Sequence, residues 1–240
     1  MSLRGLSLAA SAGLLGVALL SFAFLPRAAP AAPKAEARVA HAPATLKAAP
    51  APAAAALEAS SRLLQLPPLR IENQTTRETR ELRLYGGDGQ VDELAAEQLD
   101  ELLCDARRPH QRDTTRISRR TLQLLFKAAY HFASYEVEVV SAYRKPGPHR
   151  EGPHGTGSAI DFRLKGVKAA LLASYLREIP RTGVGIYTHP KTQYVHLDSR
   201  EHSFHWADAS PPRRHWRERS LGGANLEKND ARYNPAGDWP

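Results

Sequence analysis

The chain has 240 residues, which is enough for one domain of ordinary size with flanking tails. Its formal net charge of +8 favours anionic partners, such as nucleic acid, anionic lipid or an anionic cell-wall polymer. The single cysteine, Cys104, excludes an intrachain disulfide and a cysteine-based zinc site. Its apolar surroundings in DELLCDA indicate a small buried residue.

The first 27 residues are typical of a signal peptide or an N-terminal membrane anchor. One early arginine, Arg4, precedes an uncharged apolar run from Gly5 to Pro26. This run approaches membrane-spanning length, whereas the small residues of RAAPAAP after it favour cleavage. In either case we expect the protein to be exported, to the periplasm or cell envelope, and an uncleaved run would tether it to the membrane.

Two segments of low hydrophobicity flank the expected domain. Residues 28–60 are almost all alanine and proline, which predicts a flexible, partly extended linker. Residues 217–240 are polar and rich in turn formers, so we expect little order there. The folded domain is therefore expected over residues 61–216.

Helices and strands alternate irregularly along this domain. Because strands are concentrated late in the chain, with helices before and among them, we predict an α+β fold in which helices pack on one face of a small antiparallel sheet. Strands are expected over 80–90, 136–144, 158–165, 182–188 and 193–200, and helices over 92–106, 118–133 and 166–180.

An aspartate interrupts the apolar strand SAIDFRLK. Alternation points Ile160 and Phe162 to one face and Asp161 to the other. A carboxylate between two hydrophobic residues is tolerated where a cation meets it. His154 precedes the strand in HGTG, where glycine lets the loop fold back, so the histidine and the aspartate can converge.

The strand QYVHLDSR follows the same rule. Val195 and Leu197 share one face, while the other face carries Tyr194, His196 and Asp198. His154, Asp161 and His196 thus form a set of two histidines and one carboxylate. Three protein ligands with an open fourth position are what a catalytic zinc requires, and the same set suits non-haem ferrous iron.

Four motifs occur in a fixed order: SAYR, HGTGSAIDFR, GVGIY and YVHLDS. Over about residues 82–206 they resemble the M15-like (LAS-type) zinc peptidases, most closely the murein endopeptidase K type (domain of unknown function 882). The resemblance implies a LAS-type metallopeptidase fold, with Zn²⁺ bound by His154, Asp161 and His196. Arg144 in SAYR matches the arginine that holds a substrate carboxylate or carbonyl oxygen, a role that suits a forked guanidinium.

The general base departs from the commonest pattern. Many LAS-type enzymes have a carboxylate three positions before the last histidine, where this chain has Gln193; the endopeptidase K branch also lacks it. Asp198 is the candidate base, because alternation puts it beside His196. Alternatively, Asp198 orients a metal ligand or binds Arg144. His189, in the loop YTHPKTQ, is a further alternative.

Together with these residues, the resemblance implies a zinc-dependent peptidoglycan peptidase, a murein endopeptidase or carboxypeptidase, that hydrolyses stem peptides or cross-links during cell-wall remodelling. Asp198 and Arg144 are the expected catalytic residues. Tyr194 is either a donor to the oxyanion or a wall of the cleft.

The alternative to an enzyme, indicated by Gln193, is a non-catalytic zinc-containing module that binds peptidoglycan. Only the net charge suggests nucleic acid; interleaved aromatics and a recognition-helix signature are lacking, so no nucleic-acid partner is expected.

Overall fold

The computed structural model describes residues 58, 61–105, 116–145, 152–214, 216, 218–223 and 225–240. The expected signal or anchor over 1–27, and nearly all of the expected linker over 28–60, lie outside the described residues. Among the residues that are described, no helix is long and apolar enough to cross a membrane.

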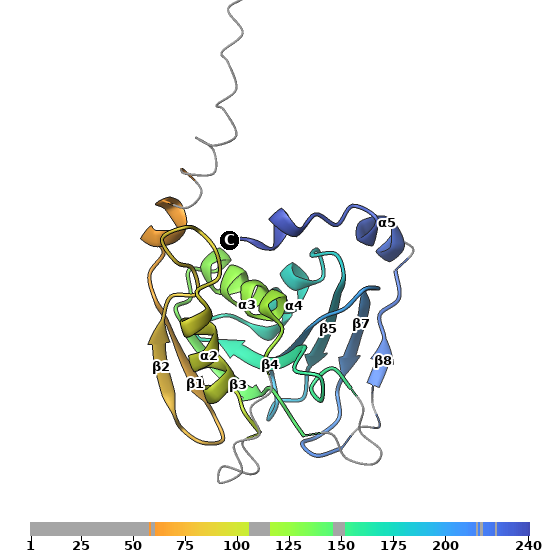
Figure 1. The fold of residues 1–240 in the computed structure, drawn as a ribbon. Helices are drawn as coiled ribbons and strands as arrows, with labels where there is room; N and C mark the ends of the chain where they lie inside the picture. The colour runs from red at the N-terminus through yellow and green to blue at the C-terminus, as the bar shows by residue number, and fades with distance from the viewer. Residues whose placement is uncertain are drawn as a thin grey trace, which may run out of the picture. The chain divides into compact units, whose positions relative to one another are not determined.

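An eight-stranded mixed sheet forms the centre of the fold (Figure 1), in the order β2-β1-β3-β4-β6-β5-β7-β8. Neighbouring strands are antiparallel in five pairings, whereas β1 lies parallel to β3 and β5 lies parallel to β7. The strands are β1 (Leu69–Asn73), β2 (Thr79–Leu82), β3 (Glu136–Ser141), β4 (Ala159–Leu164), β5 (Thr182–Tyr187), β6 (Val195–Ser199), β7 (Phe204–Asp208) and β8 (Glu218–Ser220).

The α+β class is confirmed, but the sheet is neither small nor purely antiparallel. The predicted strands correspond to β2, β3, β4, β5 and β6, whereas β1, β7 and β8 extend the sheet on both sides. Strand β8 is exposed at all three residues, so it carries no buried pattern that a sequence analysis could detect. The two parallel pairings depend on which strands become neighbours, and alternation along a single strand does not specify this.

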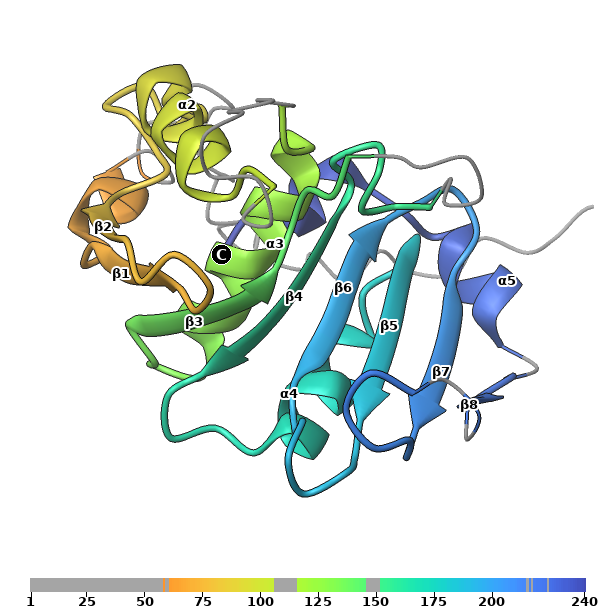
Figure 2. The same ribbon diagram turned by 90° about the horizontal axis from the view of Figure 1, so that it is seen from below.

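Two helices cover one face of the sheet (Figures 1 and 2). Helix α3 (Arg119–His131) contacts β4 and β6, and α4 (Ala169–Leu176) contacts β4, β5 and β6. Helix α2 (Glu93–Leu102) packs near β2 and is capped by Asp92, whose carboxylate accepts hydrogen bonds from the first-turn amides. A buried apolar core lies between the helices and the sheet.

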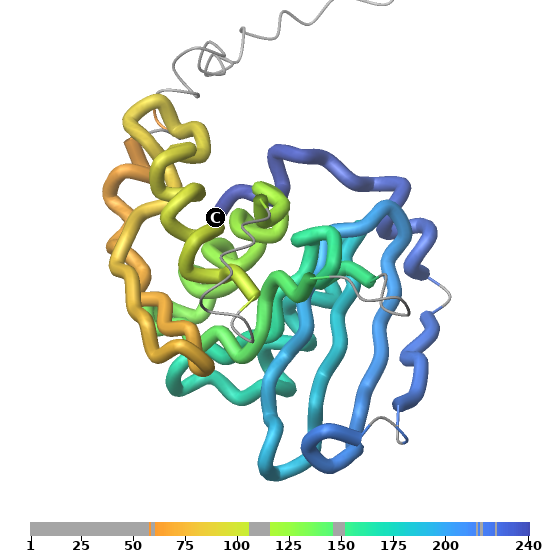
Figure 3. Tube along the Cα trace, turned by 60° about the horizontal axis from the view of Figure 1, so that its bottom comes forward, coloured from red at the N-terminus to blue at the C-terminus, as the bar shows by residue number. Residues whose placement is uncertain are grey.

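The described residues after 216 form secondary structure, where the sequence analysis expected little order. They contain β8, α5 (Leu226–Asp230) and the 3-10 helix η1 (Pro235–Asp238), and their trace ends beside α3 (Figure 3). The carboxylate of Asp238 pairs with Arg120 on α3 at 2.9 Å, and the Trp239 carbonyl accepts from Lys127 on the same helix. Partly buried contacts to charged side chains thus attach this polar segment to α3.

Candidate metal centre

Three side chains converge on the sheet face opposite the helices. Asp161 on β4 lies directly across from His196 on β6, and His154 enters from the turn before β4. Asp161 Oδ1 is 2.8 Å from His196 Nδ1 and 3.3 Å from His154 Nε2, and the two ring nitrogens are 3.1 Å apart. All three residues are buried, with exposed fractions of 8% or less. The convergence expected from alternation is therefore present.

The turn that carries His154 fixes the orientation of its ring. Nδ1 of His154 lies 2.6 Å from the carbonyl of Ala142, and because a carbonyl only accepts, Nδ1 must hold the proton. The Arg144 amide donates to the His154 carbonyl at 3.1 Å, which ties the turn to the end of β3. Gly157 completes the turn with a φ of 74°, a conformation that favours glycine. Nε2 of His154 is thereby directed at Asp161, and in the neutral ring its lone pair is available to a ligand.

The ring of His196 is oriented from the other side. Its Nε2 donates to Oδ2 of Asp198 at 2.9 Å, which leaves Nδ1 as the nitrogen directed at Asp161. Asp198 is fully buried, and Arg200 donates to both of its oxygens. Each histidine thus uses one nitrogen for a fixed hydrogen bond and offers the other to the centre.

This donor set fits a metal ion. Ligating histidines usually donate their second N–H to a carbonyl or carboxylate, as both rings do here. The three candidate ligand atoms are separated by 2.8, 3.1 and 3.3 Å. Two corners of a tetrahedron around zinc, with bonds of about 2.0–2.1 Å, are about 3.3 Å apart. Two imidazoles and one carboxylate suit zinc, and they also suit ferrous iron.

The two histidines stabilise the ionised form of Asp161. Burial raises the pKa of Asp161, but the charges and hydrogen bonds of His154 and His196 outweigh it and hold that pKa well below its usual range. Burial lowers the pKa of His196, but hydrogen bonds to Asp161 and Asp198 outweigh it and raise that pKa. Asp161 is therefore ionised at neutral pH, as a metal ligand must be.

The position of Asp198 argues against the predicted role as general base. Burial raises its pKa, but hydrogen bonds from Arg200 and His196 outweigh this and lower it. Both oxygens already accept hydrogen bonds, and no part of the residue is exposed to a water molecule that it could deprotonate. The geometry favours the alternative, a carboxylate that orients His196, and its arginine partner is Arg200 rather than Arg144.

The remaining predicted residues lie at the rim or outside the centre. Arg144 places its guanidinium 3.9 Å from Oδ2 of Asp161, and 42% of its side chain is exposed, so a substrate can reach it. Gln193 is exposed, and its carbonyl accepts from Arg163. His189 is engaged within its own loop, where its ring accepts from the Lys191 amide at 3.2 Å.

Two glycines of β5, Gly183 and Gly185, make room for the centre. A Cβ on Gly185 would lie 2.3 Å from the indole of Trp206, and a Cβ on Gly183 would lie 2.1 Å from Asp198 Oδ2. The indole in turn packs on His196, with ring centroids 4.9 Å apart. Alternation along GVGIY puts both glycines on the face of His196, so the signal was present in the sequence.

Two tyrosines stand next to Asp161. The rings of Tyr187 and Tyr194 stack with centroids 4.2 Å apart, at the ends of β5 and β6. Burial, and after it the negative charge of Asp161, raise the pKa of both hydroxyls. Both hydroxyls are therefore protonated at neutral pH and can donate hydrogen bonds. Tyr194 was predicted on this face; Tyr187 was missed, although it follows the same alternation.

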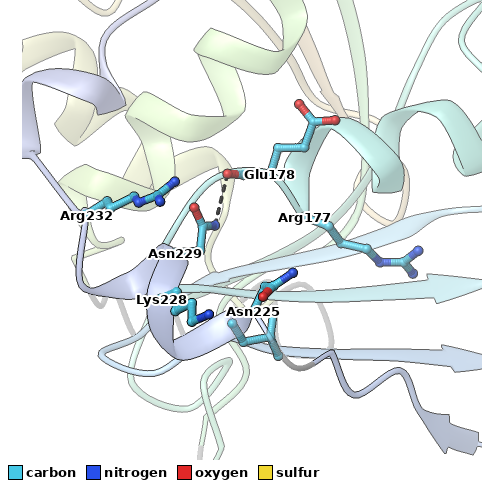
Figure 4. A pocket seen from close by; sticks show the side chains of 7 residues that line it. Arg177, Glu178, Asn225, Lys228, Asn229 and Arg232 are labelled. Atoms are coloured by element: carbon cyan, nitrogen blue, oxygen red, sulfur yellow. Dashed lines mark hydrogen bonds between the residues drawn. The ribbon is translucent and has the colours of Figure 1, made fainter.

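A separate pocket of about 530 Å³ lies between the end of α4 and α5 (Figure 4). One of its walls is closed by a hydrogen bond from Asn229 to the Glu178 carbonyl. None of the predicted site residues lines it; its lining residues are Arg177, Glu178, Asn225, Leu226, Lys228, Asn229 and Arg232.

The fold and the centre together define an α+β protein with a buried histidine–aspartate–histidine group able to hold a metal ion. The chain belongs to the Peptidase_M15_2 family, because the family model described as peptidoglycan L,D-endopeptidase MepK matches residues 62–206. The expected M15-like family is thereby confirmed. A search of curated proteins and a search of solved structures found no match. The family match ends at Trp206, so β8, α5 and η1 lie beyond it.

Proposed function

We propose that the protein is a zinc-dependent endopeptidase that hydrolyses an L,D-peptide bond in peptidoglycan stem peptides or cross-links. The observation that carries the proposal is the group of His154, Asp161 and His196, whose candidate ligand atoms all lie within 4.8 Å of one another. The family description supplies the substrate class. The apolar run over residues 5–26 supports a site of action outside the cytosol, in the periplasm or cell envelope.

A zinc ion held by these three residues would polarise the scissile carbonyl and lower the pKa of a bound water to about 7. The protein's own residues would then bind and orient the substrate. Arg144, exposed at the rim, would fix a stem-peptide carboxylate through forked hydrogen bonds. The protonated hydroxyls of Tyr187 and Tyr194 would donate to the oxyanion. Asp198 would keep His196 in the ligating tautomer.

A second candidate, a zinc-containing module that binds peptidoglycan without cleaving it, is favoured by one observation. The position that holds a base in many related enzymes is the exposed Gln193, and Asp198 is sealed in its ion pair with Arg200. A protein with an intact metal site and no proton acceptor would bind substrate without turning it over.

Digestion of purified murein sacculi separates the two candidates. The protein is incubated with sacculi, and the released muropeptides are identified by mass, with and without a chelator. The enzyme predicts new products that disappear with the chelator and with His154→Ala. The matched control is His202→Ala, since His202 is exposed and does not belong to the ligand set. Binding without products would favour the module, and an unchanged rate in His154→Ala would refute the metal assignment.

A further inference from the structure

Arg200, the first residue after β6, forms a forked pair with Asp198. Its Nε donates to Oδ1 at 2.6 Å, and a terminal nitrogen donates to Oδ2, the same oxygen that accepts from His196. The carboxylate is fully buried, whereas 28% of the Arg200 side chain is exposed. Two parallel hydrogen bonds fix the plane of a carboxylate in a way that one contact does not.

The surroundings hold this pair in one place. The Arg200 amide donates to the Arg181 carbonyl at 3.1 Å, and its guanidinium lies 5.7 Å from the centre of the Phe204 ring. The pair occupies the space that a side chain at position 183 would need. A Cβ on Gly183 would lie 2.1 Å from Asp198 Oδ2 and 2.4 Å from a terminal nitrogen of Arg200.

We propose that Arg200 is a positioning residue of the metal centre. It fixes the Asp198 carboxylate in the plane that accepts the Nε2 proton of His196, and so keeps Nδ1 of His196 directed at Asp161. The chain of contacts runs from Arg200 through Asp198 to His196, which with His154 and Asp161 would hold the ion. The inference rests on the proposed function only in taking a metal ion as the ligand of this centre.

Zinc affinity separates this role from a merely structural salt bridge. The dissociation constant for zinc is measured by competition with a chelating dye, and the thermal midpoint is measured separately in excess chelator. Loss of a group that orients a ligand typically weakens metal binding about 10- to 100-fold, so we expect this loss in Arg200→Ala. Arg200→Lys keeps the charge but not the fork, and should recover part of the affinity. Arg77→Ala is the control, since Arg77 pairs with Glu72 at an exposed site.

A double-mutant cycle tests the route through Asp198. If Arg200 acts by fixing Asp198, it has no carboxylate to orient in Asp198→Asn. Adding Arg200→Ala to that variant should then reduce zinc affinity little further. Gly183→Ala provides an uncharged test, because its methyl group must displace the pair, and we expect a similar loss of affinity. Zinc affinity within twofold of the parent in Arg200→Ala, or losses that simply multiply in the double variant, would overturn the proposal.

The same proteins are incubated with murein sacculi to keep the two proposals apart. A parent protein that binds zinc but releases no muropeptides refutes the proposed hydrolysis, while the zinc affinities still decide the role of Arg200. A parent that cleaves murein, with zinc affinity unaffected by Arg200→Ala, refutes the positioning role and leaves the enzyme in place.

Discussion

The indole of Trp206 lies across Gly185 and fills the space that a side chain at position 185 would occupy. The two residues are register partners on the parallel strands β5 and β7. From this position the indole reaches His196, with ring centroids 4.9 Å apart, and it stacks on Phe204 at 5.7 Å. A glycine on one strand thus allows an aromatic residue of the next strand to pack against a candidate metal ligand two strands away.

Gly185→Ala should damage the metal centre as well as the fold. Its Cβ would lie 2.3 Å from Cε2 of Trp206, and the indole is held on both sides, so the ring must move off His196. Overpacking of this kind costs about 1–3 kcal/mol. We expect a lower thermal midpoint in chelator together with weaker zinc binding. Gly87→Ala is the control, since a Cβ there meets nothing within 4 Å. Equal behaviour of the two variants would contradict the prediction.

Arg144 should act on substrate binding and not on the metal. Its guanidinium is at the rim, 3.9 Å from the Asp161 carboxylate, and is not needed to orient either histidine. A charge-assisted hydrogen bond contributes about 1.5–3 kcal/mol, so Arg144→Ala should reduce kcat/KM on muropeptides by about tenfold or more. The kcat/KM of Arg144→Lys should lie between those of the parent and of Arg144→Ala, because lysine keeps the charge but cannot form two parallel hydrogen bonds.

Zinc affinity measured on the same variants completes the test of Arg144. It should stay within a few-fold of the parent, because no ligand changes. The exposed Arg77→Ala variant controls for the loss of one positive charge. A large loss of zinc binding in Arg144→Ala would place this arginine among the groups that build the centre.

The polar face of the centre could be predicted because its signal is local. The side chains of a strand alternate with a period of two, so Asp161, His196 and Asp198 could be assigned to one face before any pairing was known. The helices α3 and α4 follow from apolar periodicity in the same way. Each of these features depends on residues close together in the chain.

The choice between the two roles of Asp198 and the extent of the sheet could not be predicted, because both depend on which side chains and strands become neighbours in the folded protein. Alternation placed Asp198 beside His196, but it could not show that Arg200 occupies both oxygens. The strand β8 has no buried residue, and its pairing with β7 depends on the course of the whole C-terminal segment. Tertiary contacts, not local propensity, decide such elements.

The buried His205 should make the domain less stable in mild acid. In the part of the chain that the structure describes, its Nε2 has no hydrogen-bond partner. Burial, and after it the charge of Arg177, lower the pKa of His205 to about 4, against about 6.5 in an unfolded chain. Because the unfolded chain binds the proton more readily, the stability contributed by the neutral ring is lost as the pH falls from about 6.5 to about 4.

Thermal midpoints measured in chelator from about pH 7 to about pH 5 test the predicted loss of stability at lower pH. The parent should lose several degrees more than His205→Gln, whose amide does not titrate. His202→Gln, at an exposed position of the same segment, should follow the parent. A His205→Gln variant whose midpoint falls as steeply as that of the parent would exclude this histidine as the cause.

The C-terminal segment beyond the family match should stabilise the domain through Asp230. This carboxylate accepts from the Arg181 amide at 2.6 Å, from the Ser203 amide at 2.7 Å and from the Ser203 hydroxyl at 2.6 Å, so it joins α5 to the residues that flank β5 and β7. Hydrogen bonds to a charged group contribute about 1.5–3 kcal/mol, and Asp230→Ala leaves all three donors without this acceptor. We expect the free energy of unfolding to fall by about 2–3 kcal/mol, measured by urea denaturation in chelator. Glu227→Ala, on an exposed position of the same helix, should change it by no more than about 0.5 kcal/mol.

Truncation after residue 216 removes β8, α5 and η1 together and should destabilise the domain more than Asp230→Ala does. A truncated protein as stable as the parent would show that these contacts do not support the fold.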